Sequence, residues 1–166
     1  MKYDFQIVTD EMLGDEGKDD YVKFLKSEDV KGYMNAYTQS FTYENENGRD
    51  QQVVLVVPEN EKEFTEYIDL FVEKQFKKDR HYNLDGIMIT KKLDEIRPKD
   101  KTDIELRDSD LVETRIKPDR VVDNYIGHFV FMTKKTYEET FNKKYETNSY
   151  YIKLNDVSKK DELIAD

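Results

Sequence analysis

The longest uninterrupted apolar segment of this 166-residue chain is only five residues long, Val53–Val57. A helix that crosses a bilayer needs roughly 18–20 apolar residues, so this segment cannot be one. Its length is typical of a strand buried in a sheet, and Pro58 provides a natural end. We therefore expect Gln51–Val57 to be a buried strand.

Composition indicates one folded domain with a small core. Hydrophobic residues make up 37% and charged residues 39% of the chain, proportions that approach those of disordered proteins. However, aromatic residues reach 13%, and there are only 6 Gly and 3 Pro. Because disordered chains are poor in aromatic residues, we expect a folded core rich in Tyr and Phe.

Charge and cysteine content exclude several classes of protein. The 27 Lys and Arg against 37 Asp and Glu give a net charge of -10, which disfavours nucleic acid and anionic membrane surfaces as partners. The chain has no cysteine, so disulfide scaffolds, thiolate zinc sites and cysteine nucleophiles are excluded. Met1 is followed directly by a strand pattern, and the chain ends within a helix pattern that Ser158 opens. We therefore expect a fragment excised from a longer protein.

The first 90 residues follow a β-α-β-β-α-β pattern. Apolar residues alternate in the first strand and recur at helical spacing elsewhere. An Asn47-Gly48 turn separates the second and third strands. This order is that of the split βαβ sheet of ferredoxin-like folds. The predicted strands are Tyr3–Ile7, Gly32–Tyr43, Gln51–Val57 and Ile87–Ile89; one predicted helix carries Tyr21, Phe24 and Leu25, and the other begins at Glu61 and carries Phe64, Tyr67, Ile68, Phe71, Val72 and Phe76.

The remaining residues, about 91–166, are richer in strands. We expect an α+β fold in one domain spanning 1–166, with a βαββαβ-like lobe over about 1–90 and a strand-rich part over about 91–166. The predicted strands are Thr102–Arg107, Leu111–Ile116, Val121–Tyr125, Phe129–Met132 and Ser149–Leu154, with one short helix at Lys134–Phe141.

The sequence lacks the common catalytic and phosphate-binding motifs. No Gly-x-Ser-x-Gly, Gly-x-Gly-x-x-Gly, Gly-x4-Gly-Lys-Ser/Thr or His-Glu-x-x-His occurs. His128 lies among apolar strand residues, where a structural hydrogen-bonding role is favoured over that of a base. Two acidic groups could be Ca²⁺ loops, but their spacing does not fit the EF-hand, and a charged helix start and a solvated hairpin tip explain them better. These groups are Asp15, Glu16, Asp19 and Asp20, and the stretch Glu44–Asp50.

The second half of the chain resembles a known family. The matching segments are Asp85–Leu93, Lys99–Leu106, Val122–Met132, Thr136-Tyr137 with Phe141, and Asn148–Leu154. Together they are similar to the large extracellular region of FtsX-like/MacB-like ABC transporter permeases, in particular the long permeases of Gram-positive bacteria. The string Asn124–Met132 is the most specific part. The chain departs from the family at Thr102, where Gly is usual, so one tight turn is expected to differ.

The resemblance implies a non-catalytic extracellular domain of a membrane permease, without cofactor or metal. It implies an α+β fold with a ferredoxin-like or porter-type lobe beside a strand-rich lobe, as in the MacB periplasmic domain. The partners implied are the permease's own transmembrane helices, a cytoplasmic ABC ATPase subunit, a second permease copy, and an extracellular peptide, lipoprotein or cell-wall protein. The domain would relay conformational change across the membrane, or bind a substrate or partner.

Two other functions are kept open. One is a free-standing extracellular protein that binds peptides or glycans, and the other is a small acidic hydrolase with paired carboxylates. We assign no catalytic, cofactor-binding or metal-binding residue. Asn124, Tyr125, Gly127 and His128 are read as a fold signature, in which Gly127 permits a bulge or close backbone approach. If a ligand surface exists, we expect it among exposed aromatic side chains near the Asn47 hairpin tip and around the Tyr150-Tyr151 pair. The residues near the tip are Tyr33, Tyr37 and Tyr43.

Overall fold

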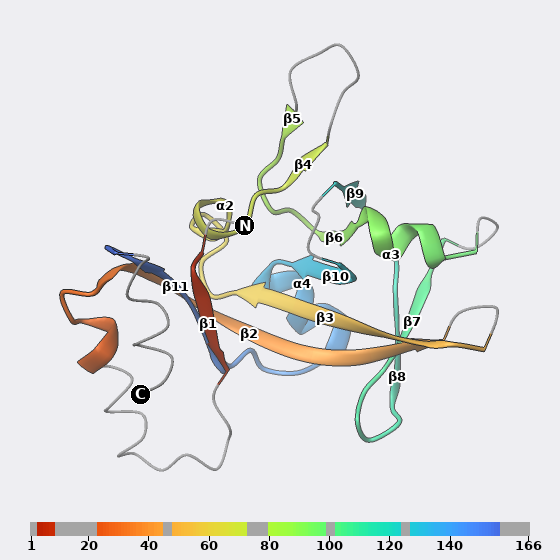
Figure 1. The fold of residues 1–166 in the computed structure, drawn as a ribbon. Coiled ribbons are helices and arrows are strands. Elements are labelled where there is room, and N and C mark those ends of the chain that lie inside the picture. Colours follow the sequence, from red (N-terminus) through yellow and green to blue (C-terminus); the bar gives the residue numbers. More distant parts are fainter. Residues whose placement is uncertain are drawn as a thin grey trace.

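The structure of the chain is a computed structural model, which describes residues 3–8, 23–44, 48–72, 80–98, 102–123 and 127–156. Within these ranges the chain is rich in strands and has short helices (Figure 1). The strands are β1 (Phe5–Val8), β2 (Val30–Glu44), β3 (Asp50–Pro58), β4 (Phe71–Val72), β5 (Arg80–His81), β6 (Ile87–Thr90), β7 (Ile104–Arg107), β8 (Glu113–Ile116), β9 (Arg120–Val122), β10 (Phe129–Met132) and β11 (Ser149–Leu154). The helices are α2 (Phe64–Tyr67), α3 (Lys91–Ile96) and α4 (Lys134–Phe141), and residues 23–25 are also helical.

All described strands except β4 and β5 form one large mixed sheet, so the predicted α+β class is confirmed. Its order is β1-β11-β2-β3-β10-β6-β9, and β7 joins the far end of β2 and pairs with β8. Most neighbours are antiparallel, but β10 runs parallel to β3, and β9 runs parallel to β6. A separate two-stranded ribbon is formed by β4 and β5.

The hairpin of β2 and β3 is the longest part of the sheet, and both of its strands were predicted. The two strands pair from Ala36 opposite Pro58 to Glu44 opposite Asp50. Gly48 has a φ of 71°, a conformation that glycine adopts without the steric penalty of a side chain. The positive-φ turn predicted at this point is confirmed for Gly48, whereas Asn47 lies outside the described residues.

The apolar run of β3 is continuous because the core lies on both sides of the sheet. Val53, Leu55 and Val57 pack in a cluster with residues of α3, α4, β7 and β8. The intervening Val56 packs in a second cluster with residues of α2. The same alternation occurs in β10. Val130 and Met132 belong to the first cluster, and Phe131 belongs to the second. A strand covered on both faces needs apolar side chains at every position.

The sheet order differs from that of a split βαβ sheet made by the first 90 residues alone. In such a sheet the strands of this segment would be one another's neighbours, but β10 lies between β3 and β6, and β11 lies between β1 and β2. Apolar periodicity identifies a strand without identifying its neighbours. The buried strands β10 and β11 are apolar enough to take central positions in the sheet.

The helix predicted from Glu61 to Phe76 is wrong beyond Tyr67. The helix α2 is a single turn, and Ile68 is already extended, with φ -132° and ψ 120°. The chain then continues into β4, whose Phe71 carbonyl accepts a hydrogen bond from the Asp123 backbone N–H at 2.7 Å. These long-range backbone contacts override the helical spacing of the apolar residues. Phe76 lies outside the described residues.

The other predicted elements are largely confirmed. The bounds of β10, α4 and β11 coincide with the predicted ones, and β1, β6, β7, β8 and β9 lie within or close to theirs. Helix α3 was absent from the periodicity pattern because it buries a single side chain, Leu93. Phe24 and Leu25 lie in the helical turn as predicted, whereas Tyr21 and the predicted helix after Ser158 lie outside the described residues.

Candidate functional site

The two histidines lie in unrelated surroundings. His81 is exposed on β5, and its Nδ1 lies 2.9 Å from Asp69 Oδ1. His128 is half-buried directly before β10, and its backbone carbonyl accepts a hydrogen bond from the Val54 N–H at 3.0 Å. Among the described residues, no cluster of three or more His, Asp or Glu side chains is arranged to hold a metal ion.

The predicted acidic groups are only partly described. Asp15, Glu16, Asp19 and Asp20 lie outside the described residues, as do residues 45–47 of the second group. Asp50, at the end of that group, lies 3.6 Å from the Arg107 guanidinium across the contact of β3, β2 and β7. This ion pair links the turn end of the β2–β3 hairpin to β7.

The Asp85-Gly86 motif has a structural explanation. Gly86 has a φ of 59°, and the Asp119 Oδ2 atom lies 2.3 Å from the position that a β-carbon would take. The same oxygen accepts a hydrogen bond from the Ile87 N–H at 2.9 Å. The Asp119 N–H in turn donates to the Ile87 carbonyl at 2.7 Å. Gly86 therefore allows the loop before β9 to close on the start of β6.

The Gly127-His128-Phe129 part of the signature also serves the fold. The buried Thr90 hydroxyl donates to the Gly127 carbonyl at 2.5 Å and accepts from the Phe129 N–H at 3.0 Å. Gly127 has a φ of 132°, and no atom lies within 4 Å of its missing β-carbon. The backbone conformation rather than a close approach thus explains this glycine. Asn124 and Tyr125 lie outside the described residues.

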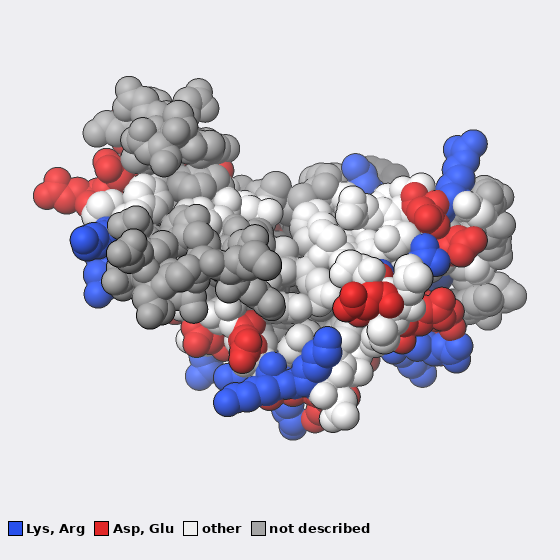
Figure 2. All heavy atoms as spheres, turned by 90° about the horizontal axis from the view of Figure 1, so that it is seen from below, with Lys and Arg blue, Asp and Glu red and all other residues white. Residues whose placement is uncertain are grey.

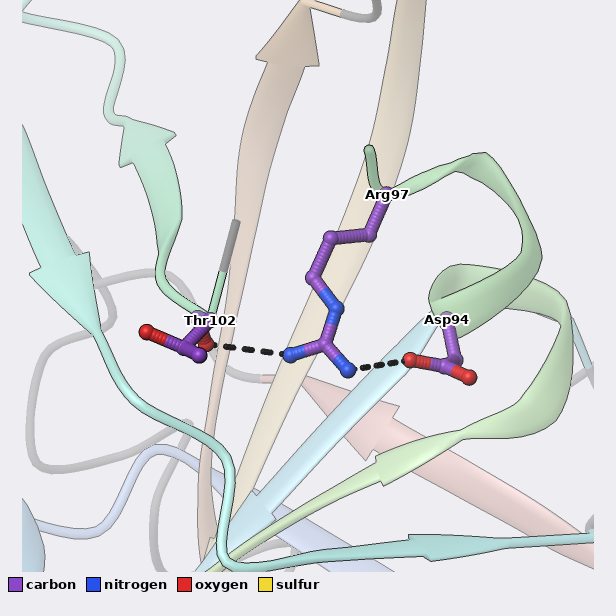
Figure 3. A network of polar contacts seen from close by, with 3 residues as sticks. All are labelled: Asp94, Arg97 and Thr102. Atoms are coloured by element: carbon purple, nitrogen blue, oxygen red, sulfur yellow. Dashed lines mark hydrogen bonds and ion pairs between the residues drawn. The ribbon is translucent and has the colours of Figure 1, made fainter. Parts of the chain in front are cut away.

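Thr102, at the position where the permeases that the sequence resembles usually have glycine, does not have a left-handed backbone. Its carbonyl accepts a hydrogen bond from Arg97 Nη1 at 3.0 Å, and Arg97 Nη2 also binds the Asp94 carboxylate (Figure 3). The contact uses the backbone of Thr102, so it does not depend on the side chain. Arg97 thereby joins the end of α3 to Thr102, two residues before β7.

The aromatic residues named as a ligand surface differ in their exposure. Tyr43 and Tyr151 are buried, so the expectation that they are exposed is wrong. Tyr37 is half-buried, and its hydroxyl donates to Gln39 Oε1 at 2.5 Å. Tyr33 remains exposed and packs edge-on against the half-buried Tyr150, with ring centroids 6.2 Å apart. This pair alone leaves little aromatic surface for a ligand.

Tyr151 belongs to a buried polar network between β2 and β11. Its hydroxyl lies 2.8 Å from the Thr38 hydroxyl, which lies 2.9 Å from that of Ser149. Asn148 binds the backbone of Thr38 twice, accepting from its N–H at 2.7 Å and donating to its carbonyl at 2.8 Å. Burial raises the pKa of the Tyr151 hydroxyl, so it stays protonated. The network is a structural connection between β2 and β11, because Asn148, Ser149 and Tyr151 are all bonded to Thr38.

A cleft of about 560 Å³ lies where β3 and β10 end. Because these strands are parallel neighbours, their carboxyl ends meet at the same edge of the sheet. The segment after β3 forms one wall and the first turns of α4 form the other. The cleft is lined by Glu59, Asn60, Glu61, Lys62, Lys134, Lys135, Glu138 and Glu139.

Polar contacts beneath the cleft hold its walls in place. Glu59 accepts a hydrogen bond from Asn35 Nδ2 at 2.9 Å. The buried Tyr145 hydroxyl donates to the Val57 carbonyl at 2.8 Å, and Lys134 Nζ lies 5.3 Å from the centre of the Tyr145 ring. Burial raises the pKa of Tyr145, and the Glu59 carboxylate raises it further. The cleft is open to solvent, and it offers both ammonium and carboxylate groups on walls that these contacts hold in place.

Sequence reasoning missed this cleft. Its lysines and glutamates are ordinary surface residues in the sequence, and only the parallel pairing of β3 with β10 brings the two groups together. The predicted signature residues do not line it. In the part of the chain that the structure describes, no helix is long and apolar enough to span a bilayer.

Comparison with known proteins identifies similar structures but no family. No protein-family model and no curated protein matches the chain. The fold is similar to the extracellular domain of the noncanonic ABC-type transporter YknZ from Gram-positive bacteria, with a TM-score of 0.47, 12% identity, and coverage of 95% of this chain and 88% of that one. It is also similar to the periplasmic region of MacB from Actinobacillus actinomycetemcomitans, with a TM-score of 0.42, 12% identity, and coverage of 96% and 81%. The sequence resemblance also names ABC transporters and MacB.

Proposed function

We propose that the chain is a non-catalytic extracellular domain of an ABC transporter permease subunit, which relays conformational change across the membrane or binds a substrate or partner. Residues 1–166 would form a single domain, with a first lobe over about 1–90 and a strand-rich part over about 91–166. Its partners would be the permease's own transmembrane helices, a cytoplasmic ABC ATPase and a second permease copy. The family-like segments Asp85–Leu93 and Val122–Met132 support the proposal, since their described parts form adjoining strands.

The observation that carries the proposal is the pairing of β1 with β11. The Asp4 N–H donates to the Ile152 carbonyl at 2.7 Å, and the Leu154 N–H donates to Asp4 Oδ2 at 2.6 Å. The chain therefore enters β1 and leaves β11 at the same point of the sheet. A domain inserted between two membrane-spanning helices requires this geometry, because both of its connections must reach the same membrane surface.

The same pairing supports a relay of motion. β11 pairs with β2 over six positions, from Ser149 opposite Ala36 to Leu154 opposite Val30. A displacement of β1 or β11 by a moving helix would therefore be transmitted to β2 and, through it, to the rest of the sheet. A close-packed sheet transmits strain because it has little free volume to absorb it.

The sequence of the gene on both sides of this region tests the proposal. We expect one apolar stretch of about 20 residues on each side, and a neighbouring gene for an ATPase with a phosphate-binding loop. A cleavable signal before the domain and a stop codon directly after it would contradict the proposal. The free-standing binding protein would then be favoured.

The cleft favours a second candidate, peptide binding. Its lysines and glutamates could pair with a carboxylate and an ammonium of the same short peptide, whereas the flat aromatic faces that sugars commonly use do not line it. Calorimetry with a Lys-Ala-Ala-Glu peptide and an all-Ala control peptide tests this function. Lys134→Glu should abolish the binding and Lys143→Glu, outside the cleft, should preserve it. Equal binding of both peptides, or no binding, would contradict it.

A further inference from the structure

The turn between β7 and β8 presents two apolar side chains to solvent. Leu111 is 73% exposed and Val112 57% exposed, and among the described residues Tyr33 is the only other large hydrophobic side chain classed as exposed, at 37%. The turn projects beyond the β2–β3 ribbon, at the lower side of the molecule in Figure 1. Figure 2 looks at that side and shows charged side chains of both signs around a stretch of uncharged surface.

The turn is held rigidly from within. The Asp108 carboxylate accepts hydrogen bonds from the backbone N–H groups of Asp110 at 2.9 Å and Val112 at 3.0 Å. The Asp108 N–H donates to the Val112 carbonyl at 3.0 Å, and the Leu111 N–H donates to the Asp108 carbonyl at 3.1 Å. The root of the hairpin is anchored in the core by the buried side chains of Ile104, Leu106 and Ile116.

Leucine at position 111 is expected to destabilise this turn. Its φ is 64°, in the left-handed region, where Gly and Asn are favoured and a leucine is strained. Its side chain points into solvent and so gains little from packing. A strained residue with no packing role at the tip of a rigid hairpin is explained by a contact outside the domain.

Charge identifies the kind of surface that fits this tip. Asp110 and Glu113 flank the two apolar side chains, and both are exposed. These carboxylates would be repelled by an anionic membrane surface and by a second copy of this chain, whose net charge is -10. A protein with an apolar pocket bordered by Lys or Arg would complement both the shape and the charge.

We propose that the β7–β8 turn, through Leu111 and Val112, inserts into an apolar pocket with a basic rim on another protein. This surface goes beyond the proposed permease function and does not depend on how the domain is connected to a membrane.

Photo-crosslinking in the cells that make the full-length protein tests the proposal. Leu111 is replaced by p-benzoylphenylalanine, and the same replacement at the exposed Lys117, at the opposite end of β8, is the control. We expect an adduct with one protein from position 111 only, with the adduct mapped to apolar residues beside Lys or Arg. No adduct, or adducts only with lipid or with a second copy of this chain, would overturn the proposal.

Binding to the purified crosslinked protein then separates docking from folding. Leu111→Asn should lower the affinity at least about tenfold, as for a central contact residue, while leaving the melting temperature unchanged or raised. Leu111→Gly should behave in the same way. The affinity of the wild-type protein should decrease when the NaCl concentration is raised from about 50 to about 500 mM. Affinities of both variants within about twofold of wild type would overturn the proposal.

Discussion

The carboxylate of Asp119 occupies the space that a side chain on Gly86 would need, with Oδ2 2.3 Å from the β-carbon position. The same oxygen binds the Ile87 N–H at the start of β6. The Asp85-Gly86 motif looks like a simple turn in the sequence, but Gly86 also makes room for Asp119, which lies 33 residues further along the chain.

Gly86→Ala should therefore destabilise the fold more than a turn glycine normally does. The alanine must adopt a left-handed backbone, at a cost of roughly 1–2 kcal/mol. It must also displace Asp119 from Ile87, which adds about 1 kcal/mol for the lost hydrogen bond. Urea unfolding should show a total loss of about 2–3 kcal/mol.

Gly48→Ala is the matched control, because Gly48 has a φ of 71° but no atom within 4 Å of its β-carbon position. It should show only the backbone cost of roughly 1–2 kcal/mol. Equal losses for the two variants would contradict the role given to Asp119.

Thr90→Val tests the hydroxyl that connects β6 to the segment before β10. Valine keeps the shape but leaves the Gly127 carbonyl and the Phe129 N–H without this partner, so unfolding free energy should fall by about 1–3 kcal/mol. Thr114→Val, at a half-buried position of β8, should change stability by less than about 0.5 kcal/mol. A Thr90→Val protein as stable as wild type would show that water replaces the hydroxyl at no cost.

Asn148→Ala tests the double contact with Thr38. The variant removes the amide side chain that bonds both the N–H and the carbonyl of Thr38. We therefore expect the free energy of unfolding, measured with a chemical denaturant, to fall by about 1–3 kcal/mol. Asn155→Ala removes one exposed hydrogen bond, to the Glu28 carbonyl, and should cost clearly less. The reverse order of the two losses would contradict the account of the network.

Stability should fall in alkaline solution because of the buried tyrosines. Burial raises the pKa of Tyr151 and Tyr145 above that of an unfolded-chain tyrosine, about 10. Their contribution to the free energy of unfolding is complete below about pH 10. It is lost as the pH rises toward the pKa of the folded state, because the unfolded state then binds fewer protons than the folded state. Each tyrosine should contribute a slope of up to about 1.4 kcal/mol per pH unit.

Unfolding midpoints between about pH 8 and pH 11 measure this slope. Tyr151→Phe should reduce it, whereas Tyr33→Phe, at an exposed position, should leave it unchanged. A slope that is the same in Tyr151→Phe and wild type would show that Tyr151 ionises in the folded state as readily as in the unfolded chain.

The sequence predicted local elements better than their arrangement. β10, α4 and β11 follow directly from apolar spacing and flanking polar residues, because these signals are local. The placement of β10 between β3 and β6 depends on pairing between distant segments, which periodicity does not specify. The same limit explains why the helix was extended beyond Tyr67, where Phe71 instead forms β4 and its backbone bonds Asp123. The cleft could not be predicted, since it exists only where β3 and β10 run parallel.

We propose above that this domain lies outside the cell as part of a membrane protein, and site-specific labelling tests that placement. Because the chain has no cysteine, Lys143→Cys provides a single exposed thiol here, and the buried Tyr151→Cys provides a control. Any cysteines elsewhere in the full-length protein are replaced by serine. We predict that Lys143→Cys reacts with a membrane-impermeant maleimide in intact cells and stays in the membrane fraction after an alkaline wash. Labelling only after lysis, or recovery in the soluble fraction, would contradict the account.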